Sequence, residues 1–269
     1  MHEQTRYADC GTCALGASRV APSSRLWSQP SEDSAPHHVL LFYRTSFLVD
    51  LGGGREHVLR PGQAIVSSPG VTYRRRLIDP RGEALDWLWL RADLLGETLG
   101  SESPQSMGIP LDGATVLLQR RVHRLAQRGA PGVQVEAAAM ELAHALRRRA
   151  ELGEPNAAPQ RARQRVARAI ELMAAHPDSP LTLDEISDEM GLSPAYACVV
   201  FKQVTGTTLT RFHRDLRLFA SLAELESNAP DLTRVALRYG FSSHAHYTAR
   251  FHDAFGVTPS AARRQLQTA

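Results

Sequence analysis

Two segments of the chain, 183–206 and 232–256, carry the same pattern of residues, and this repeat constrains the fold more than any other feature. Each copy predicts a short helix with an apolar face, a glycine suited to a left-handed turn, a serine cap and a second helix. This order is typical of a helix-turn-helix, which the chain therefore contains twice. The matching pairs are Leu183 and Leu232, Ile186 and Val235, Met190 and Tyr239, Gly191 and Gly240, Leu192 and Phe241, Ser193 and Ser242, Phe201 and Phe251, and Gly206 and Gly256. The last two pairs lie one residue further apart than the others, which indicates one inserted residue near Ser243.

The segment from about Arg165 to Arg264 resembles the DNA-binding domain of the AraC/XylS family of bacterial transcriptional regulators. The resemblance rests on residues 181–186 (Leu-Thr-Leu-Asp-Glu-Ile), 191–196 (Gly-Leu-Ser-Pro-Ala-Tyr), 201–202, 217–218, 235–243 (Val-Ala-Leu-Arg-Tyr-Gly-Phe-Ser-Ser) and 255–260 (Phe-Gly-Val-Thr-Pro-Ser). It implies a sequence-specific regulator, not an enzyme, with double-stranded DNA and RNA polymerase as partners. Two recognition helices would lie about one helical turn of DNA apart, at a spacing set by a helix from Leu209 to Glu226. The alternative is that Gly-Phe-Ser-Ser is only a capping turn in another helical domain.

In the second copy, residues at the start of the second helix would face the major groove. The candidates are Ser243, His244, Ala245, His246, Thr248 and Arg250. Members of the family often carry an arginine where Ala249 stands, whereas here the arginine follows at position 250. Arginine is the commonest side chain to read guanine, so we expect Arg250 to contact a guanine or a phosphate. The alternative is an arginine that is solvated on the domain surface.

The first copy offers fewer side chains that can read bases. Ala195, Cys198 and Val199 stand where relatives often carry polar residues, and none of them can make a bidentate base contact. We therefore expect this copy to position the protein, or to read DNA shape and thymine methyl groups, while the second copy carries more of the direct readout. The candidate DNA-contacting residues are Ser193, Ala195, Tyr196, Val199, Lys202 and Arg211, with Tyr196, Lys202 and Arg211 assigned to phosphates.

Short apolar or aromatic runs alternate with glycine and proline turns between residues 39 and 91. This pattern predicts an antiparallel sandwich or barrel, and the family resemblance implies a cupin-like jelly roll. Two stretches without internal proline or glycine follow, 115–128 and 133–149, and predict a pair of helices. The predicted fold class is thus a two-domain α+β protein, with an N-terminal antiparallel β jelly roll (cupin-like) plus two helices, and a C-terminal all-α domain with two helix-turn-helix motifs.

The length of 269 residues favours two domains. Residues 1–36 are rich in small and polar residues with little periodicity, and predict an irregular N-terminal arm with at most one short strand. Residues 151–160 combine glycine, proline and asparagine, as linkers do. The expected boundaries are an arm at 1–36, a cupin-like sensor and dimerisation domain at 37–150, a linker at 151–160 and an AraC-type DNA-binding domain at 161–269.

The N-terminal half is expected to sense a small-molecule effector, to form a homodimer through the helices at 115–150, or both. Aromatic side chains and arginines inside the roll would suit a polar or anionic ligand. The candidates are Tyr43, Arg44, Tyr73, Arg74, Arg76, Trp87 and Trp89. Trp87 and Trp89 are two residues apart on one predicted strand and so share a face. Both can equally well fill the core or pack under the helix pair.

Metal chemistry has weak support. His37 and His38 are adjacent and His57 is isolated, so the ligand pattern of a metal-binding cupin is missing, and no cofactor is assigned. The pair Cys10 and Cys13 leaves three readings open: unligated cysteines in a flexible arm, half of a zinc site completed by His2, His37 or His38, or a thiol pair that oxidises.

No apolar run approaches the roughly 18–20 residues of a membrane span, and residues 1–6 lack the apolar core of a secretion signal. With only three cysteines, a cytoplasmic protein without a membrane partner is expected. The formal net charge of +3 is too small to argue for DNA by itself. Two alternatives to a ligand-sensing regulator stay open: a regulator controlled by protein partners with the roll as a scaffold, and a cupin-type enzyme fused to a DNA-binding anchor.

Overall fold

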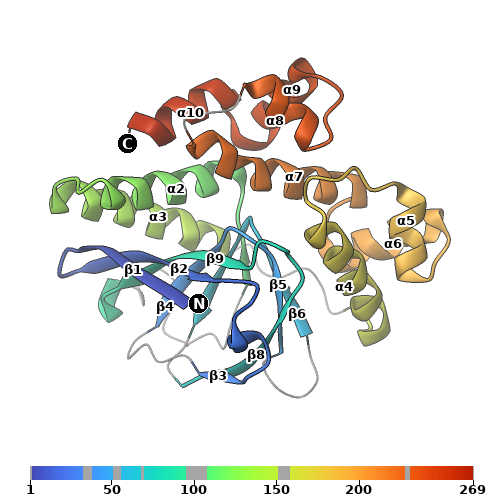
Figure 1. Ribbon diagram of the computed structural model, residues 1–269, viewed down its shortest axis with the longest axis horizontal. Coiled ribbons are helices and arrows are strands. Elements are labelled where there is room, and N and C mark those ends of the chain that lie inside the picture. The colour runs from blue at the N-terminus through green and yellow to red at the C-terminus, as the bar shows by residue number, and fades with distance from the viewer. Residues whose placement is uncertain are drawn as a thin grey trace.

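The computed structural model describes residues 2–32, 38–50, 56–67, 70–94, 108–150, 158–227 and 231–268. Antiparallel strands fill most of the N-terminal half, and the C-terminal half is helical (Figure 1). One sheet has the order β1-β2-β9-β4-β7-β10 and the other the order β3-β8-β5-β6. The strands are β1 (His2–Asp9), β2 (Cys13–Val20), β3 (Ser31–Glu32), β4 (Val39–Tyr43), β5 (Phe47–Asp50), β6 (Glu56–Leu59), β7 (Gln63–Ser67), β8 (Thr72–Leu77), β9 (Glu83–Leu90) and β10 (Gly108–Pro110), with a short 3-10 helix at Arg25–Trp27.

The two-residue period of β4 and β9 divides their side chains between two cores. Leu40, Phe42 and Leu88 lie on the face that α2 (Gly113–Gln127) and α3 (Gly132–Ala150) cover. Tyr43 and Trp87 belong to a second cluster with Phe47, Val49 and Leu59 of the other sheet. The prediction of antiparallel strands followed by two helices is therefore confirmed, and the two tryptophans do share one face of β9.

The irregular arm predicted for residues 1–36 is wrong, because β1 and β2 pair with each other and β2 pairs with β9 along its whole length. The sequence hides these strands for two reasons. Every side chain of β1 except Tyr7 and Ala8 is exposed, so no apolar alternation marks it. β2 is built largely from small residues, with Gly16 opposite Trp87 on β9, and its partner lies about seventy residues away in the chain.

The C-terminal helices form two groups, and one long helix joins them. They are α4 (Gln160–Ala175), α5 (Leu183–Met190), α6 (Pro194–Thr205), α7 (Leu209–Glu226), α8 (Leu232–Arg238), α9 (His244–Phe255) and α10 (Pro259–Thr268). The start of α7 packs with α4, α5 and α6, through Leu209, Phe212 and Leu216. Its later part packs with α8, α9 and α10, so the helix predicted at 209–226 joins the two copies of the repeat.

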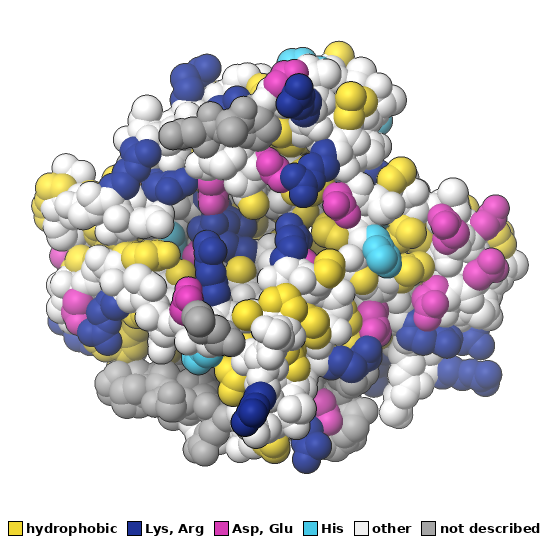
Figure 2. All heavy atoms as spheres, in the orientation of Figure 1, with side chains coloured by type: hydrophobic (Ala, Val, Ile, Leu, Met, Phe, Trp, Pro, Cys, Tyr) yellow, Lys and Arg dark blue, Asp and Glu magenta, His cyan; other side chains and the backbone are white. Residues whose placement is uncertain are grey.

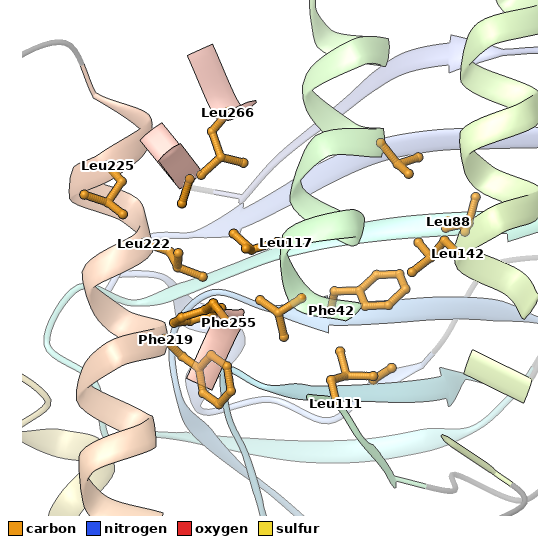
Figure 3. Packing of buried hydrophobic residues seen from close by; sticks show 14 of the residues in the cluster. Phe42, Leu88, Leu111, Leu117, Leu142, Phe219, Leu222, Leu225, Phe255 and Leu266 are labelled. Atoms are coloured by element: carbon orange, nitrogen blue, oxygen red, sulfur yellow. The ribbon is translucent and has the colours of Figure 1, made fainter. Parts of the chain in front are cut away.

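The second copy shares its core with the N-terminal half. Phe219 and Leu222 of α7, together with Phe255, lie in one cluster with Leu117 of α2 and Phe42 of β4 (Figure 3). In Figure 1, α2 and α3 accordingly lie between the sheets and the last three helices. Across the described parts of the chain, we find no helix with both the length and the hydrophobicity to cross a membrane.

Candidate nucleic-acid interface

The turn of each copy has the predicted glycine in the left-handed conformation. Gly191 has φ 61° between α5 and α6, and Gly240 has φ 70° between α8 and α9. Such angles disfavour any residue with a Cβ, so the two glycines set the direction in which the second helix leaves. Ser243 caps α9 by accepting a hydrogen bond from the His246 backbone N–H at 3.1 Å. Ser193 occupies the same position before α6, but its side chain makes no capping hydrogen bond, so the prediction of two serine caps holds only for α9.

An arginine from the preceding long helix holds each turn. Arg165 on α4 donates from Nη1 to the Gly191 carbonyl at 2.8 Å. Arg217 on α7 donates from Nε to the Tyr239 carbonyl at 2.6 Å and from Nη2 to the Gly240 carbonyl. Its guanidinium carbon lies 4.6 Å from the ring centroid of Phe241. Charged donors make stronger hydrogen bonds than neutral ones. Each copy thus has an arginine on the long helix before it, Arg165 on α4 or Arg217 on α7, that holds its turn. Comparison of the two copies in the sequence did not assign a role to either arginine.

The exposed side of α9 carries the predicted DNA-contacting residues of the second copy. His244, Ala245, His246 and Arg250 are exposed, while Tyr247, Phe251 and Phe255 on the opposite side are buried. The Arg250 guanidinium donates to Asp253 at 3.3 Å on the surface. The His246 ring turns back to the start of the helix, with Nδ1 3.0 Å from the Ser242 hydroxyl and its edge against Phe241. His244 and Thr248 form a long contact of 3.4 Å.

The first copy exposes apolar side chains on α6. Tyr196 is 57% exposed and Val199 is 49% exposed, high values for large apolar residues, and Lys202 is exposed beside them. Ala197, Val200 and Phe201 face the core. Arg211, at the start of α7, is exposed and lies 3.6 Å from Asp215. These positions leave Val199 accessible for the expected methyl contact, and Tyr196 and Lys202 accessible for the expected phosphate contacts.

The two helices of the first copy differ in charge. Its first helix, α5, exposes Asp184, Glu185, Asp188 and Glu189, and acidic side chains gather over this part of the molecule at the right of Figure 2. Carboxylates repel DNA phosphates, whereas α6 carries Lys202 and no acidic residue. Of the two helices, α6 is therefore the one suited to DNA.

Comparisons with known proteins bear on the helical half. A family profile described as a helix-turn-helix domain matches residues 186–265. The Transposon Tn10 TetD protein of Escherichia coli is 38% identical over 87 residues, which are 32% of this chain and 63% of TetD. The regulatory protein SoxS of Salmonella typhimurium is 31% identical over 97 residues, which are 36% of this chain and 91% of SoxS. The crystal structure of the AraC-like transcriptional activator CuxR covers 83% of this chain and 81% of its own, at 17% identity and a TM-score of 0.42.

Nearly the whole of SoxS aligns with part of this chain. The chain belongs to the AraC/XylS family. Its AraC-type domain comprises the two helix-turn-helix copies, and curated relatives such as SoxS are regulatory proteins, in agreement with the prediction that the chain is not an enzyme. The chain spans 63% of the length of TetD and 30% and 33% of two longer curated relatives.

The ligand-binding candidates of this AraC/XylS chain lie in different places. Tyr43, Tyr73, Trp87 and Trp89 belong to the cluster between the sheets, and Arg74 is exposed on β8. Arg44 pairs with Asp86 on β9 at 2.8 Å and reaches the helical half, where it pairs with Glu226 of α7 at 2.6 Å. Arg76 pairs with Glu171 on α4 at 2.6 Å. Among the described residues, the aromatic candidates are therefore gathered together, and Arg44 and Arg76 instead join the β-rich half to the AraC-type domain.

A cavity of about 560 Å³ lies elsewhere, where α2 and α3 meet the end of the AraC-type domain. Leu117, Leu118 and Leu125 of α2 form one wall, and Phe255 and Val257 form another. Arg121 and Glu141 supply charged groups at its edge. The remaining lining residues are Ala114, Gln265 and Thr268. No pattern in the sequence indicates this cavity, because its walls come from segments more than a hundred residues apart.

Proposed function

We propose that this chain is a transcriptional regulator that places α6 and α9 in successive major-groove segments of double-stranded DNA. The observation that carries the proposal is the repeated geometry: each copy ends in a helix whose start is exposed, directed by a left-handed glycine and an arginine from the preceding helix. Because α7 packs into the cores of both copies, it holds the two helices at one spacing. A rigid spacing is what two half-sites on one DNA face require.

The two recognition helices contribute differently. α9 offers His244, Thr248 and Arg250, which can donate or accept hydrogen bonds at base edges. α6 offers Val199, which suits methyl contact and shape readout, while Tyr196 and Lys202 suit phosphate. We therefore assign most of the direct base readout to the second copy.

The N-terminal half is proposed as a cupin-like sensor of a small polar or anionic molecule, with the cluster of Tyr43, Tyr73, Trp87 and Trp89 as its candidate site. The contacts between the halves support such a role. Arg44, Arg60 and Arg76 each reach the helical half, and Arg60 lies 4.4 Å from the ring centroid of Phe212 on α7. A ligand that shifts the sheets would thereby shift α7, on which both recognition helices depend.

The homodimer is proposed to form through α3. One face of α2 is covered by α7, α9 and α10, whereas α3 exposes Val133, Ala137 and His144 on its outer side. A second copy that binds there would give avidity on paired DNA sites. Sedimentation of the full chain, with Val133→Asp as the variant, tests this interface, and an unchanged oligomeric state in the variant argues against it.

Selection of bound sequences from a random DNA pool, at low and at moderate salt, tests the DNA-binding proposal. Two enriched blocks centred about 10 bp apart are expected if both helices read sequence, and one block if only α9 does. Absence of enrichment at both salt concentrations, also with metabolites and metals added, would overturn the proposal. Thermal unfolding across the same metabolites tests the sensor: no stabilisation by any of them favours a regulator controlled by protein partners.

A further inference from the structure

The hairpin between β1 and β2 brings two cysteines together. The Cys10 backbone N–H donates to the Cys13 carbonyl at 2.8 Å, and the pairing continues the register of Asp9 opposite Ala14. Residues that stand opposite each other on antiparallel strands have Cα atoms about 4.5–5.5 Å apart. Disulfides join residues with Cα separations of about 4.4–6.8 Å. The two thiols can therefore be joined without rebuilding the hairpin.

The two cysteines differ in access. Cys13 is 1% exposed and belongs to the core under α2 and α3, whereas Cys10 is partly exposed and packs at the edge of this core. Burial, followed by the neighbouring Cys10 thiol, raises the pKa of the Cys13 thiol. A partly exposed thiol beside a buried one is the arrangement of an attacking and a resolving cysteine.

The hairpin tip is held against the start of α3. A Cβ at Gly132, the first residue of α3, would lie 3.7 Å from the Cys10 sulfur. The Thr12 hydroxyl donates to Glu136 on the first turns of α3, and the Arg91 backbone N–H donates to the Thr12 carbonyl at 2.9 Å. These contacts keep the tip ordered, so the two thiols stay opposite each other.

We propose that Cys10 and Cys13 form a reversible disulfide when the protein meets a hydroperoxide. The Cys10 thiolate attacks the terminal peroxide oxygen, the O–O bond breaks, and an alcohol or water leaves with the former thiol proton. The Cys13 thiol then attacks the Cys10 sulfenic acid, the S–S bond forms, and water leaves with the Cys13 proton. Overall, two thiols are oxidised and one hydroperoxide is reduced to an alcohol and water.

A zinc site at this hairpin is the weaker reading. Structural zinc takes four ligands, and no group of three or more His, Cys, Asp or Glu residues that could hold a metal occurs in the described ranges. His37, one of the predicted partners, lies outside those ranges. His2 is at the other end of β1, where its ring nitrogen lies 3.0 Å from the Ser18 hydroxyl.

Peptide mass mapping of the full chain after hydrogen peroxide treatment tests the disulfide. Trypsin releases residues 7–19 as one peptide that contains Cys10 and Cys13 and no other cysteine, and Cys198 on its separate peptide is the internal reference. We expect the 7–19 peptide to lose the mass of two hydrogens, to resist alkylation at both thiols and to regain them with dithiothreitol. In Cys13→Ala we expect a sulfenic acid at Cys10 that dimedone traps. In Cys10→Ser we expect Cys13 to stay reduced.

Two results would overturn the proposal. One is oxidation of Cys10 to a sulfinic acid in the wild-type chain while Cys13 remains a thiol. The other is purification with one zinc ion per chain that protects both thiols and is lost in Cys10→Ser. Neither result depends on DNA, so the disulfide and the DNA-binding proposal succeed or fail separately.

Discussion

Arg44, in the turn after β4, pairs with Glu226, the last residue of α7, at 2.6 Å. The same carboxylate accepts from Arg120 on α2 at 3.2 Å, and the Arg124 guanidinium donates to the Glu226 carbonyl at 3.1 Å. Arg44 is held in turn by Asp86 on β9, through its Nε at 2.8 and 2.9 Å. The helix that joins the two DNA-binding copies is thus tied at its end to the sheet and to α2.

Glu226 is the carboxylate partner of Arg44 and Arg120, which have little access to water. We expect Glu226→Gln to lower the free energy of unfolding by about 1–3 kcal/mol, because the amide keeps one acceptor oxygen but loses the negative charge opposite the two cations. The matched control is Glu224→Gln, two residues nearer the N-terminus, whose partner Arg238 is 59% exposed at its side chain. Such a surface ion pair contributes at most about 1 kcal/mol to the free energy of unfolding. Urea unfolding of the three proteins measures the difference, and equal losses in both variants contradict the expectation.

The same network predicts acid sensitivity. Burial raises the pKa of Glu226, but Arg120 and Arg44 lower it by more, so the net shift is downward. A carboxyl group with a depressed folded pKa stabilises the protein above its unfolded pKa of about 4.3, and this contribution is lost as the pH falls through the folded pKa. We expect the unfolding free energy of Glu226→Gln to fall less steeply below pH 4 than that of the wild type, as urea titrations across this range would measure.

The buried side chain of His213 is expected to make the free energy of unfolding depend on pH in a second, higher pH range. Burial, followed by the nearby Arg217 guanidinium, lowers the pKa of His213 to about 4. The unfolded chain then binds this proton more readily, so stability is full above an unfolded pKa of about 6.5 and falls as the pH drops toward 4, by up to about 3 kcal/mol. His213→Gln is expected to flatten the unfolding free energy between pH 6.5 and 4, as urea titrations across this range would measure. An unchanged slope in His213→Gln contradicts the assignment.

Gly62 tests the contact between the β-rich half and α7. It has φ +81°, and a Cβ there would lie 2.5 Å from the Phe219 ring. Gly70 has φ +74°, and no atom of the described residues lies within 4 Å of a Cβ placed there, so Gly70→Ala carries the backbone cost without the collision. That cost is roughly 1–2 kcal/mol, and overpacking adds about 1–3 kcal/mol. We expect Gly62→Ala to lose more unfolding free energy in urea than Gly70→Ala, and equal losses would place Phe219 away from Gly62 in solution.

Local patterns predict much of the helical half, because each copy of the repeat marks a short helix, a turn and a second helix by signals that lie close together in the chain. The helix from Leu209 to Glu226, which the family resemblance implies, has the same two ends in the structure. Glycine and proline turns likewise separate the strands from β4 to β9. The DNA-contacting residues were named from the repeat, and the exposure of Tyr196, Val199 and Arg250 agrees with that use without testing it.

Contacts between distant segments could not be predicted in the same way. β2 pairs with β9 through small residues that carry no apolar alternation. Arg44 and Arg76 are ordinary strand-end and strand arginines in the sequence, and their partners Glu226 and Glu171 lie on helices far along the chain. Such an ion pair forms only when complete strands and helices pack together. Neither the two-residue period of strands nor the 3.6-residue period of helices contains that information.

Base reading by α9 can be separated from phosphate contact by α6 with two substitutions. Arg250→Ala removes the longest hydrogen-bonding side chain from the exposed face of α9, and we expect a loss of about 1–3 kcal/mol in binding to the selected DNA, with relaxed specificity at one base position. Lys202→Ala removes a single exposed charge on α6. It is expected to weaken binding to all sequences similarly and to reduce the salt slope by about 1. Fluorescence anisotropy over a salt series, with the selected DNA and a scrambled duplex, measures both effects. A uniform loss in Arg250→Ala, together with a reduced salt slope, would reassign that arginine to a phosphate and leave base readout to His244 and Thr248.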